Sequence, residues 1–182
     1  MVLDLIADSA GSLQSAVSAS LEMYRQGSFK PILEDDWIAM LYAKLVDGLA
    51  NATKVHVKTR IEGHNSKWDL VLGPVASGYY VVPQLVAEIK FVASAFSDQQ
   101  CLHTFGEARD RDVRKLSAVR PQCEFCTLLI FDETDWFRRS RFRETGLSRL
   151  ETLVQLTAEC GIGIQHYPLT LHRSVRELRE EV

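Results

Sequence analysis

Two strand-like segments decide the expected fold: Trp68-Asp69-Leu70-Val71-Leu72 and Leu85-Val86-Ala87-Glu88-Ile89-Lys90-Phe91. Side chains alternate between the two faces of an extended strand, so Glu88 and Lys90 project from the same face. Charged groups inside an apolar strand are costly to bury unless they are paired. The sequence therefore predicts that Asp69, Glu88 and Lys90 form either a paired structural cluster or a metal site.

These three residues, together with the upstream stretch Leu33-Glu34-Asp35-Asp36-Trp37, resemble the active-site pattern of the PD-(D/E)XK nuclease superfamily. The first half of the motif reads Trp68-Asp69 instead of Pro-Asp, at a position that varies widely in the superfamily. The resemblance covers residues 31–133. It implies a restriction-endonuclease-like α/β sandwich, with a central mixed β-sheet flanked by helices.

Composition is compatible with this expectation. A chain of 182 residues with 46% hydrophobic and 25% charged residues suits one globular domain, 1–182. Within it we expect an N-terminal helical extension over 1–30 and a motif-bearing core over 31–133. The net charge of −3 gives no general signal for nucleic acid, although a local basic patch can act where the overall charge does not show it.

The sequence carries no signal for a membrane or for secretion. Asp4 and Asp8 stand where a targeting segment would be basic, and no apolar stretch approaches the roughly 20 residues of a membrane helix. We expect a cytoplasmic protein with reduced thiols and no membrane partner. Cys123 and Cys126 have zinc-like spacing without a second pair, which favours a loop cysteine and a strand cysteine over a metal or redox site.

Hydrophobic periodicity predicts the order of elements. One or two helices are expected over 3–24, then a helix over 33–48 and an antiparallel meander of strands over 55–61, 68–72 and 79–91. Pro83 implies a bulge, a break or a bare edge in the third strand. The remaining elements are a helix over 101–119, a buried strand over 125–131, a helix over 144–160, a strand over 162–169 and a short helix over 173–180. This order is also that of the PD-(D/E)XK core.

The resemblance also implies a role for each residue of the motif. Asp69 and Glu88 would bind Mg²⁺ (or Mn²⁺) through their carboxylates, and Ile89 through its backbone carbonyl. Lys90 would position the attacking water and stabilise charge on the phosphate. The alternative is a buried Glu88–Lys90 pair with Asp69 exposed at the start of its strand.

The acidic helix start supplies one further catalytic candidate. Glu34 shares a helix face with Ile38 and Leu41, so it points toward the sheet if those residues are core. In the family such an acid helps to bind a second cation or orients the lysine. Asp35 is the rival, and a simple interaction of the acids with the positive end of the helix dipole is the alternative for both.

Basic segments indicate where nucleic acid would bind. Arg138, Arg139, Arg141 and Arg143 are interleaved with aromatic residues and could grip phosphates and stack on bases. The alternative is a solvated loop whose aromatic side chains, among them Trp136, cap the core.

Two further candidates for phosphate contact lie within and before the mixed-charge run over 109–116. Lys115 and Gln99 are the residues concerned, and a structural or merely exposed role is the alternative for each. The run itself is typical of a solvated helix face with pairing between residues four apart.

The expected function is that of a divalent-metal-dependent nuclease acting on nucleic acid, with DNA as the expected substrate. The alternative is a catalytically inactive module that keeps the nuclease fold for binding or assembly. The short chain leaves little room for a sequence-reading domain. We therefore expect weak intrinsic specificity, or specificity supplied by a homodimer or a protein partner.

Overall fold

The computed structural model describes residues 2–48, 55–76, 80–136 and 149–169, with side chains from residue 9 onward. Its centre is a five-stranded sheet in the order β1-β2-β3-β4-β5. The strands are β1 (Val55–Arg60), β2 (Lys67–Leu72), β3 (Leu85–Val92), β4 (Phe125–Asp132) and β5 (Gly163–Pro168). β1, β2 and β3 form the expected antiparallel meander, whereas β3, β4 and β5 are parallel to one another.

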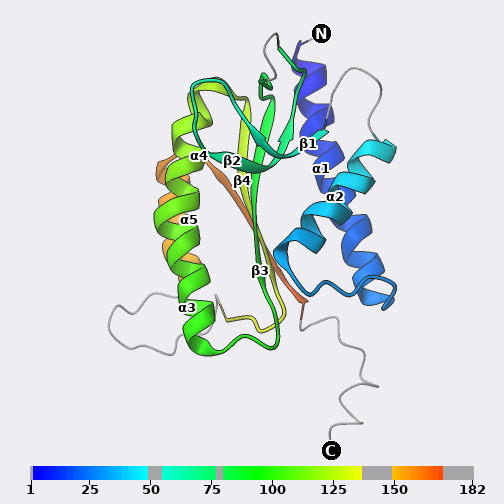
Figure 1. Cartoon of the computed structure of the whole chain (residues 1–182), viewed down its shortest axis with the longest axis vertical. Coiled ribbons are helices and arrows are strands. Elements are labelled where there is room, and N and C mark those ends of the chain that lie inside the picture. Colours follow the sequence, from blue (N-terminus) through cyan, green and yellow to red (C-terminus); the bar gives the residue numbers. More distant parts are fainter. Residues whose placement is uncertain (1, 49–54, 77–79, 137–148, 170–182) are drawn as a thin grey trace, which may run out of the picture.

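Helices cover both faces of the sheet (Figure 1). α1 (Val2–Arg25) and α2 (Glu34–Gly48) lie on one face, and α3 (Asp98–Glu107), α4 (Val113–Val119) and α5 (Arg149–Glu159) on the other. A π-helical turn, Ala108–Asp112, joins α3 to α4, and a 3₁₀ turn, Arg120–Gln122, follows α4. The prediction of an α/β protein with a mixed sheet flanked by helices is confirmed.

Trp37 anchors α2 to the sheet. Its side chain is fully buried, and its ring stacks on the ring of Phe131 in β4 with centroids 3.8 Å apart. Leu41 and Leu45 continue the same buried face of the helix, as expected from their spacing, whereas Tyr42 is 40% exposed. This packing fixes the N-terminus of α2, with its three acidic residues, beside β3.

The prediction of one long strand over 79–91 is wrong, because β3 begins only at Leu85. Pro83 breaks the strand, which was one of its predicted effects. The residues before it form a connection in which the Val82 N–H donates to the Pro74 carbonyl and the Gln84 N–H donates to the Leu72 carbonyl. Regular pairing with β2 then starts at Leu85.

The predicted helix over 101–119 begins three residues earlier and is interrupted. Ser97 and Gln100 form a capping box, in which the Ser97 hydroxyl accepts the Gln100 N–H and the Gln100 side chain accepts the Ser97 N–H. The π-helical turn then replaces α-helix over Ala108–Asp112. Such turns insert one extra residue into a helix and often occur at functional sites.

Cys123 and Cys126 lie where a loop cysteine and a strand cysteine were predicted. Cys123 lies in the connection before β4 and Cys126 lies within β4, and both are buried, with their Sγ atoms 2.9 Å apart. Among the described residues, no helix is both long and apolar enough to cross a bilayer. The predicted strand at 162–169 is present as β5, and the predicted helix at 173–180 lies outside the described residues.

Replacing Trp37 by alanine should lower the free energy of unfolding by about 3–5 kcal/mol, because a fully buried, stacked aromatic side chain is lost. Tyr42→Ala, on the exposed side of the same helix, should change it by less than about 0.5 kcal/mol. Urea unfolding of both variants measures the difference. Equal losses in the two variants would contradict the assigned orientation of α2.

Candidate active site

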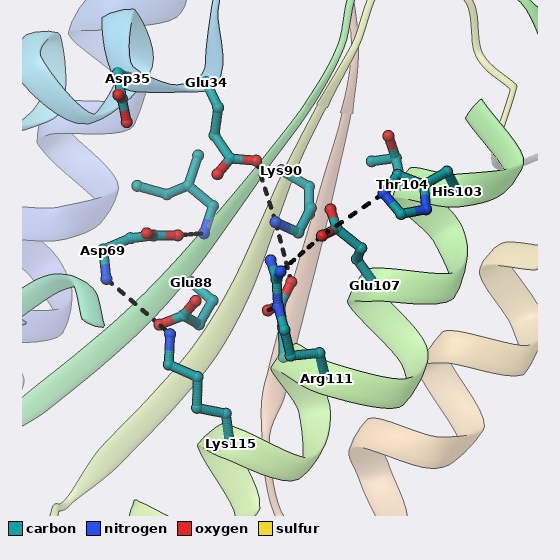
Figure 2. A network of polar contacts seen from close by, with 12 residues as sticks. Glu34, Asp35, Asp69, Glu88, Lys90, His103, Thr104, Glu107, Arg111 and Lys115 are labelled. Atoms are coloured by element: carbon teal, nitrogen blue, oxygen red, sulfur yellow. Dashed lines mark hydrogen bonds and ion pairs between the residues drawn. The ribbon is translucent and has the colours of Figure 1, made fainter. Parts of the chain in front are cut away.

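The candidate site forms where β2 separates from β3. Their ladder runs from Leu72–Leu85 to Leu70–Ala87, and Asp69 lies just beyond its last pair. There the Ile89 N–H donates to the carboxylate Oδ2 of Asp69 at 2.9 Å, and the Asp69 N–H points to Glu88 Oε1 at 3.4 Å (Figure 2). A buried backbone N–H requires an acceptor, so the separation of the strands itself draws the Asp69 carboxylate in beside Glu88.

Each of these two carboxylates also forms an ion pair with a lysine. Lys58 Nζ lies 2.7 Å from Asp69 Oδ1, and Lys115 Nζ lies 2.7 Å from Glu88 Oε1. Asp69 and Glu88 are only 5% and 2% exposed. The lysines therefore offset part of the desolvation cost that two buried, neighbouring carboxylates would otherwise bear.

Lys90 is buried between two further carboxylates. Its Nζ lies 3.2 Å from Glu34 Oε2 and 3.1 Å from Asp112 Oδ2. Burial by itself lowers the pKa of Lys90, but the attraction of Asp112 and Glu34 outweighs it and raises the pKa above the ordinary lysine value. Lys90 is therefore an ammonium at neutral pH.

The three acidic residues at the start of α2 have three different partners. Glu34 contacts Lys90, and burial raises the pKa of its carboxyl group. Asp35, whose side chain is 74% exposed, lies 3.3 Å from Lys58. Asp36 accepts two backbone N–H groups from the residues just before the helix, and these hydrogen bonds lower its pKa. The helix acid that contacts Lys90 is thus Glu34 and not Asp35, and Asp36 caps the helix.

Lys58 has an unusual backbone conformation for a strand residue. Its φ angle is +46°, in the left-handed region that non-glycine residues rarely adopt. The β1–β2 register pairs Val57 with Leu70 and Thr59 with Trp68, and the ladder is interrupted at Lys58, opposite Asp69. Strain of this kind is typical of functional sites. Here it accompanies the contact of the lysine with the Asp69 carboxylate.

The Glu88 carboxyl group is the most perturbed acid of the site. Burial, and next the negative charge of Asp69, raise its pKa to about 8, and Lys115 only partly reverses the effect. A raised pKa favours the protonated form of a carboxyl group, and positive charge beside it, here that of Lys115, favours the carboxylate. A cation bound beside Glu88 would therefore stabilise the ionised form of its carboxyl group.

A cleft of about 320 Å³ opens over this cluster. Its lining contains three acids and five basic side chains, and consists of Glu34, Lys58, Ser66, Lys67, Asp69, Glu88, Lys90, Arg111 and Lys115. A second hollow of about 330 Å³ shares Ser66, Arg111 and Lys115 with it and adds, among others, His64, Asp110 and Arg114. Basic side chains therefore outnumber the acids in the lining of the two hollows, although the whole chain is acidic.

The structure brings the four predicted catalytic residues Glu34, Asp69, Glu88 and Lys90 into this one cleft. The alternative of a Glu88–Lys90 pair with an exposed Asp69 does not hold, because Asp69 is buried and the two other residues have separate partners. Ile89 contributes its N–H to Asp69, and its carbonyl as a metal ligand stays a prediction.

The predicted nucleic-acid contacts have different outcomes. Lys115 lies in the cleft, whereas Gln99 is exposed in the first turn of α3 and is not among the residues that line it. Arg138, Arg139, Arg141 and Arg143 lie outside the described residues. Trp136 is 3% exposed and packs against Phe105, so it caps the core and is not available to stack on bases.

Sequence reasoning missed Asp112 and Lys58. Asp112 was assigned to a solvated face, but it is fully buried against Lys90. Its spacing from Leu116 and Val119 could have placed it on the buried helix face, because residues at i, i+4 and i+7 share a face. No comparable signal marks Lys58, since its position depends on the left-handed backbone of β1.

A second group of possible metal ligands lies elsewhere in the described part of the chain. Asp132 at the end of β4, Asp135 and His166 of β5 have ligand atoms within 4.8 Å of one another. His166 Nε2 is 3.3 Å from Asp132 Oδ2. The imidazole makes this a mixed nitrogen and oxygen donor set, which does not identify Mg²⁺.

We compared the chain with protein-family models, with curated proteins and with solved structures, and none of the three comparisons gave a significant match.

Asp112→Asn should lower the free energy of unfolding by roughly 3 kcal/mol, because it leaves Lys90 buried with Glu34 as its one remaining carboxylate. Asp110→Asn, two residues away on the exposed side of the same turn, should leave the melting temperature unchanged within error. Urea unfolding measures the free energy of unfolding of both variants, and thermal unfolding measures their melting temperatures. A stable Asp112→Asn protein would show that the buried pair is not required for the fold.

Glu88→Gln should change how stability depends on pH. The folded-state pKa of about 8 exceeds the ordinary value of 4.5, so the folded protein binds this proton more tightly than the unfolded chain. The stabilisation is complete below pH 4.5 and is lost as the pH rises to 8, with an upper limit of about 5 kcal/mol. Urea unfolding in chelator should show wild type losing stability over this range relative to Glu88→Gln. Parallel curves for the two proteins would contradict the raised pKa.

Proposed function

We propose that this protein is a divalent-metal-dependent nuclease of the PD-(D/E)XK type with a restriction-endonuclease-like fold, and that its substrate is DNA. The observation that carries the proposal is the meeting of Asp69 and Glu88 at the β2–β3 separation, with Lys90 in the same open cleft. A structural ion-pair cluster has no need of a cleft of about 320 Å³ that opens over its acids.

The donor set fits Mg²⁺ or Mn²⁺. The Asp69 and Glu88 carboxylates supply hard oxygen ligands, which these cations prefer. The Ile89 N–H leaves β3 on the edge that faces Asp69, and in an extended strand the carbonyl of the same residue points to the same edge. Ile89 is therefore suited to be the third protein ligand. A bound cation would lower the pKa of a water and neutralise charge on the phosphate.

Lys90 acts in this proposal as a fixed positive charge. Its raised pKa makes it a poor proton acceptor near neutral pH, so a role as general base is disfavoured. With two of its three N–H donors directed at Glu34 and Asp112, the ammonium can donate one hydrogen bond to the attacking water or to a phosphate oxygen. Glu34 and Asp112 hold it in place from two sides, so its position changes little as charge develops on the phosphate.

The groove favours a polyanion as substrate. Lys67, Arg111, Arg114 and Lys115 lie along the two adjoining hollows, and Asp69 and Glu88 line the first of them. Phosphate-neutralising side chains supply most of the non-specific affinity for nucleic acid, and this affinity falls steeply with salt. Such contacts carry no sequence information, which agrees with the expected weak intrinsic specificity.

The second candidate is a catalytically inactive module that keeps this fold for binding or assembly. The two lysines seated on Asp69 and Glu88 are the observation in its favour, because they satisfy the carboxylates without a cation. The two candidates differ in whether a cation displaces these lysines.

Nicking of supercoiled plasmid DNA tests the proposal. Wild type with Mg²⁺ or Mn²⁺ should convert the plasmid to its open-circular form, and chelator should abolish the reaction. Asp69→Asn and Lys90→Gln should each lower the rate by at least about 100-fold, because a ligand or the fixed charge is lost. Glu22→Gln, on the exposed side of α1, is the matched control and should retain the wild-type rate. Nicking that survives in Asp69→Asn would exclude the proposed site.

A further inference from the structure

We infer, on the basis of the proposed function, that Lys115 is a switch that couples cation binding to nucleic-acid binding. Without a cation its ammonium holds Glu88. A cation at the Asp69–Glu88 site displaces the ammonium, which then becomes a phosphate contact in the adjoining hollow.

The contact between Lys115 and Glu88 is incompatible with a cation on the same oxygen. Nζ lies 2.7 Å from Oε1, and the two side chains are 15% and 2% exposed, so this is a direct and largely dry ion pair. A divalent cation bound at that oxygen would repel an ammonium at this distance strongly, since screening by water is weak there. A cation on Glu88 Oε1 and the Lys115–Glu88 pair therefore exclude each other.

The surroundings of Lys115 define where its ammonium goes. Lys115 lines both hollows, and the Arg111 and Arg114 side chains line the second one. Nζ also lies 4.8 Å from the centroid of the Trp68 ring, which can stabilise the ammonium as it leaves Glu88. In the second hollow it would join Arg114 and Arg111, of which Arg111 is already paired with Glu107 and Asp112. The added ammonium would give cationic groups the excess over Asp110, the acid in that lining, and so make a site for a backbone phosphate.

Lys58 differs from Lys115 in the number of carboxylates that it contacts. Lys58 contacts Asp35 at 3.3 Å as well as Asp69, so it retains a carboxylate partner when a cation occupies Asp69. For Lys115 the described part of the chain shows one ion pair, that with Glu88. Displacement therefore frees the charge of Lys115 for substrate but leaves that of Lys58 neutralised.

Linkage makes the effect reciprocal: a cation that raises the affinity for DNA by some factor must itself bind more tightly to the DNA complex by the same factor. Competition from the Lys115 ammonium would then weaken cation binding by the free protein relative to the DNA complex. Loss of Lys115 should have two opposite effects, stronger cation binding by the free protein and a smaller gain in DNA affinity on cation addition.

The experiment uses the full chain with Ca²⁺, whose oxygen-ligand preference matches the site and which should not support hydrolysis as Mg²⁺ does. Calorimetry measures Ca²⁺ affinity, and fluorescence anisotropy of a short labelled DNA duplex measures DNA affinity with and without Ca²⁺. In wild type, Ca²⁺ should raise DNA affinity about fivefold or more. Lys115→Met should bind Ca²⁺ about fivefold more tightly than wild type and show a rise in DNA affinity that is smaller by a similar factor.

Lys67→Met is the matched control. Lys67, at the start of β2, is also a cationic residue of the first cleft. It should weaken DNA binding equally with and without Ca²⁺ and leave the wild-type rise intact. If Lys115→Met does not fold, Lys115→Gln serves with the same expectations.

Equal Ca²⁺ affinities for wild type and the Lys115 variant, or an undiminished rise in DNA affinity, would overturn the switch. Asp69→Asn separates this outcome from failure of the proposed function. If wild type binds Ca²⁺ and Asp69→Asn does not, the cation site stands and only the switch is wrong. If Ca²⁺ binding is absent from wild type or persists unchanged in Asp69→Asn, the proposed function falls and the switch falls with it.

Discussion

The separation of β2 from β3 at Asp69 is the constraint on which the site depends. It leaves the Ile89 N–H of a fully buried strand without a backbone acceptor from β2, and the Asp69 carboxylate takes that place. The same step turns the Asp69 N–H toward Glu88. Each carboxylate thereby accepts a main-chain N–H group, and these hydrogen bonds favour the side-chain rotamers that bring the two carboxylates together.

Charge balance follows from this arrangement. Two buried carboxylates side by side would be costly, and lysines from β1 and α4 offset them. Lys90 is balanced separately, by Glu34 from α2 and Asp112 from the π-helical turn. Elements from both faces of the sheet therefore converge on one cluster. The packing of Trp37 on Phe131 contributes indirectly, because it fixes the helix that carries Glu34.

Sequence reasoning succeeded where local rules apply. Alternation along an extended strand places Glu88 and Lys90 on one face, and helical spacing places Glu34 on the sheet side of α2. It failed at the strand that Pro83 shortens and at Asp112. For Asp112 the run of mixed charges suggested solvent, whereas the apolar spacing of the following residues indicated burial. Of these two signals, apolar spacing was the better guide, because burial is decided by the face and not by average composition.

The sequence by itself determined the order of helices and strands, the mixed character of the sheet and the candidate set Glu34, Asp69, Glu88 and Lys90, because these follow from periodicity and from the motif. Only the tertiary structure decided the partner of each charge. The elements that carry Lys58, Lys115 and the buried Asp112 are far apart in the chain. These residues reach the site because the β2–β3 ladder ends at Leu70 and because the π-helical turn rotates its side chains. Contacts of this kind arise from the packing of several elements, and no local pattern encodes them.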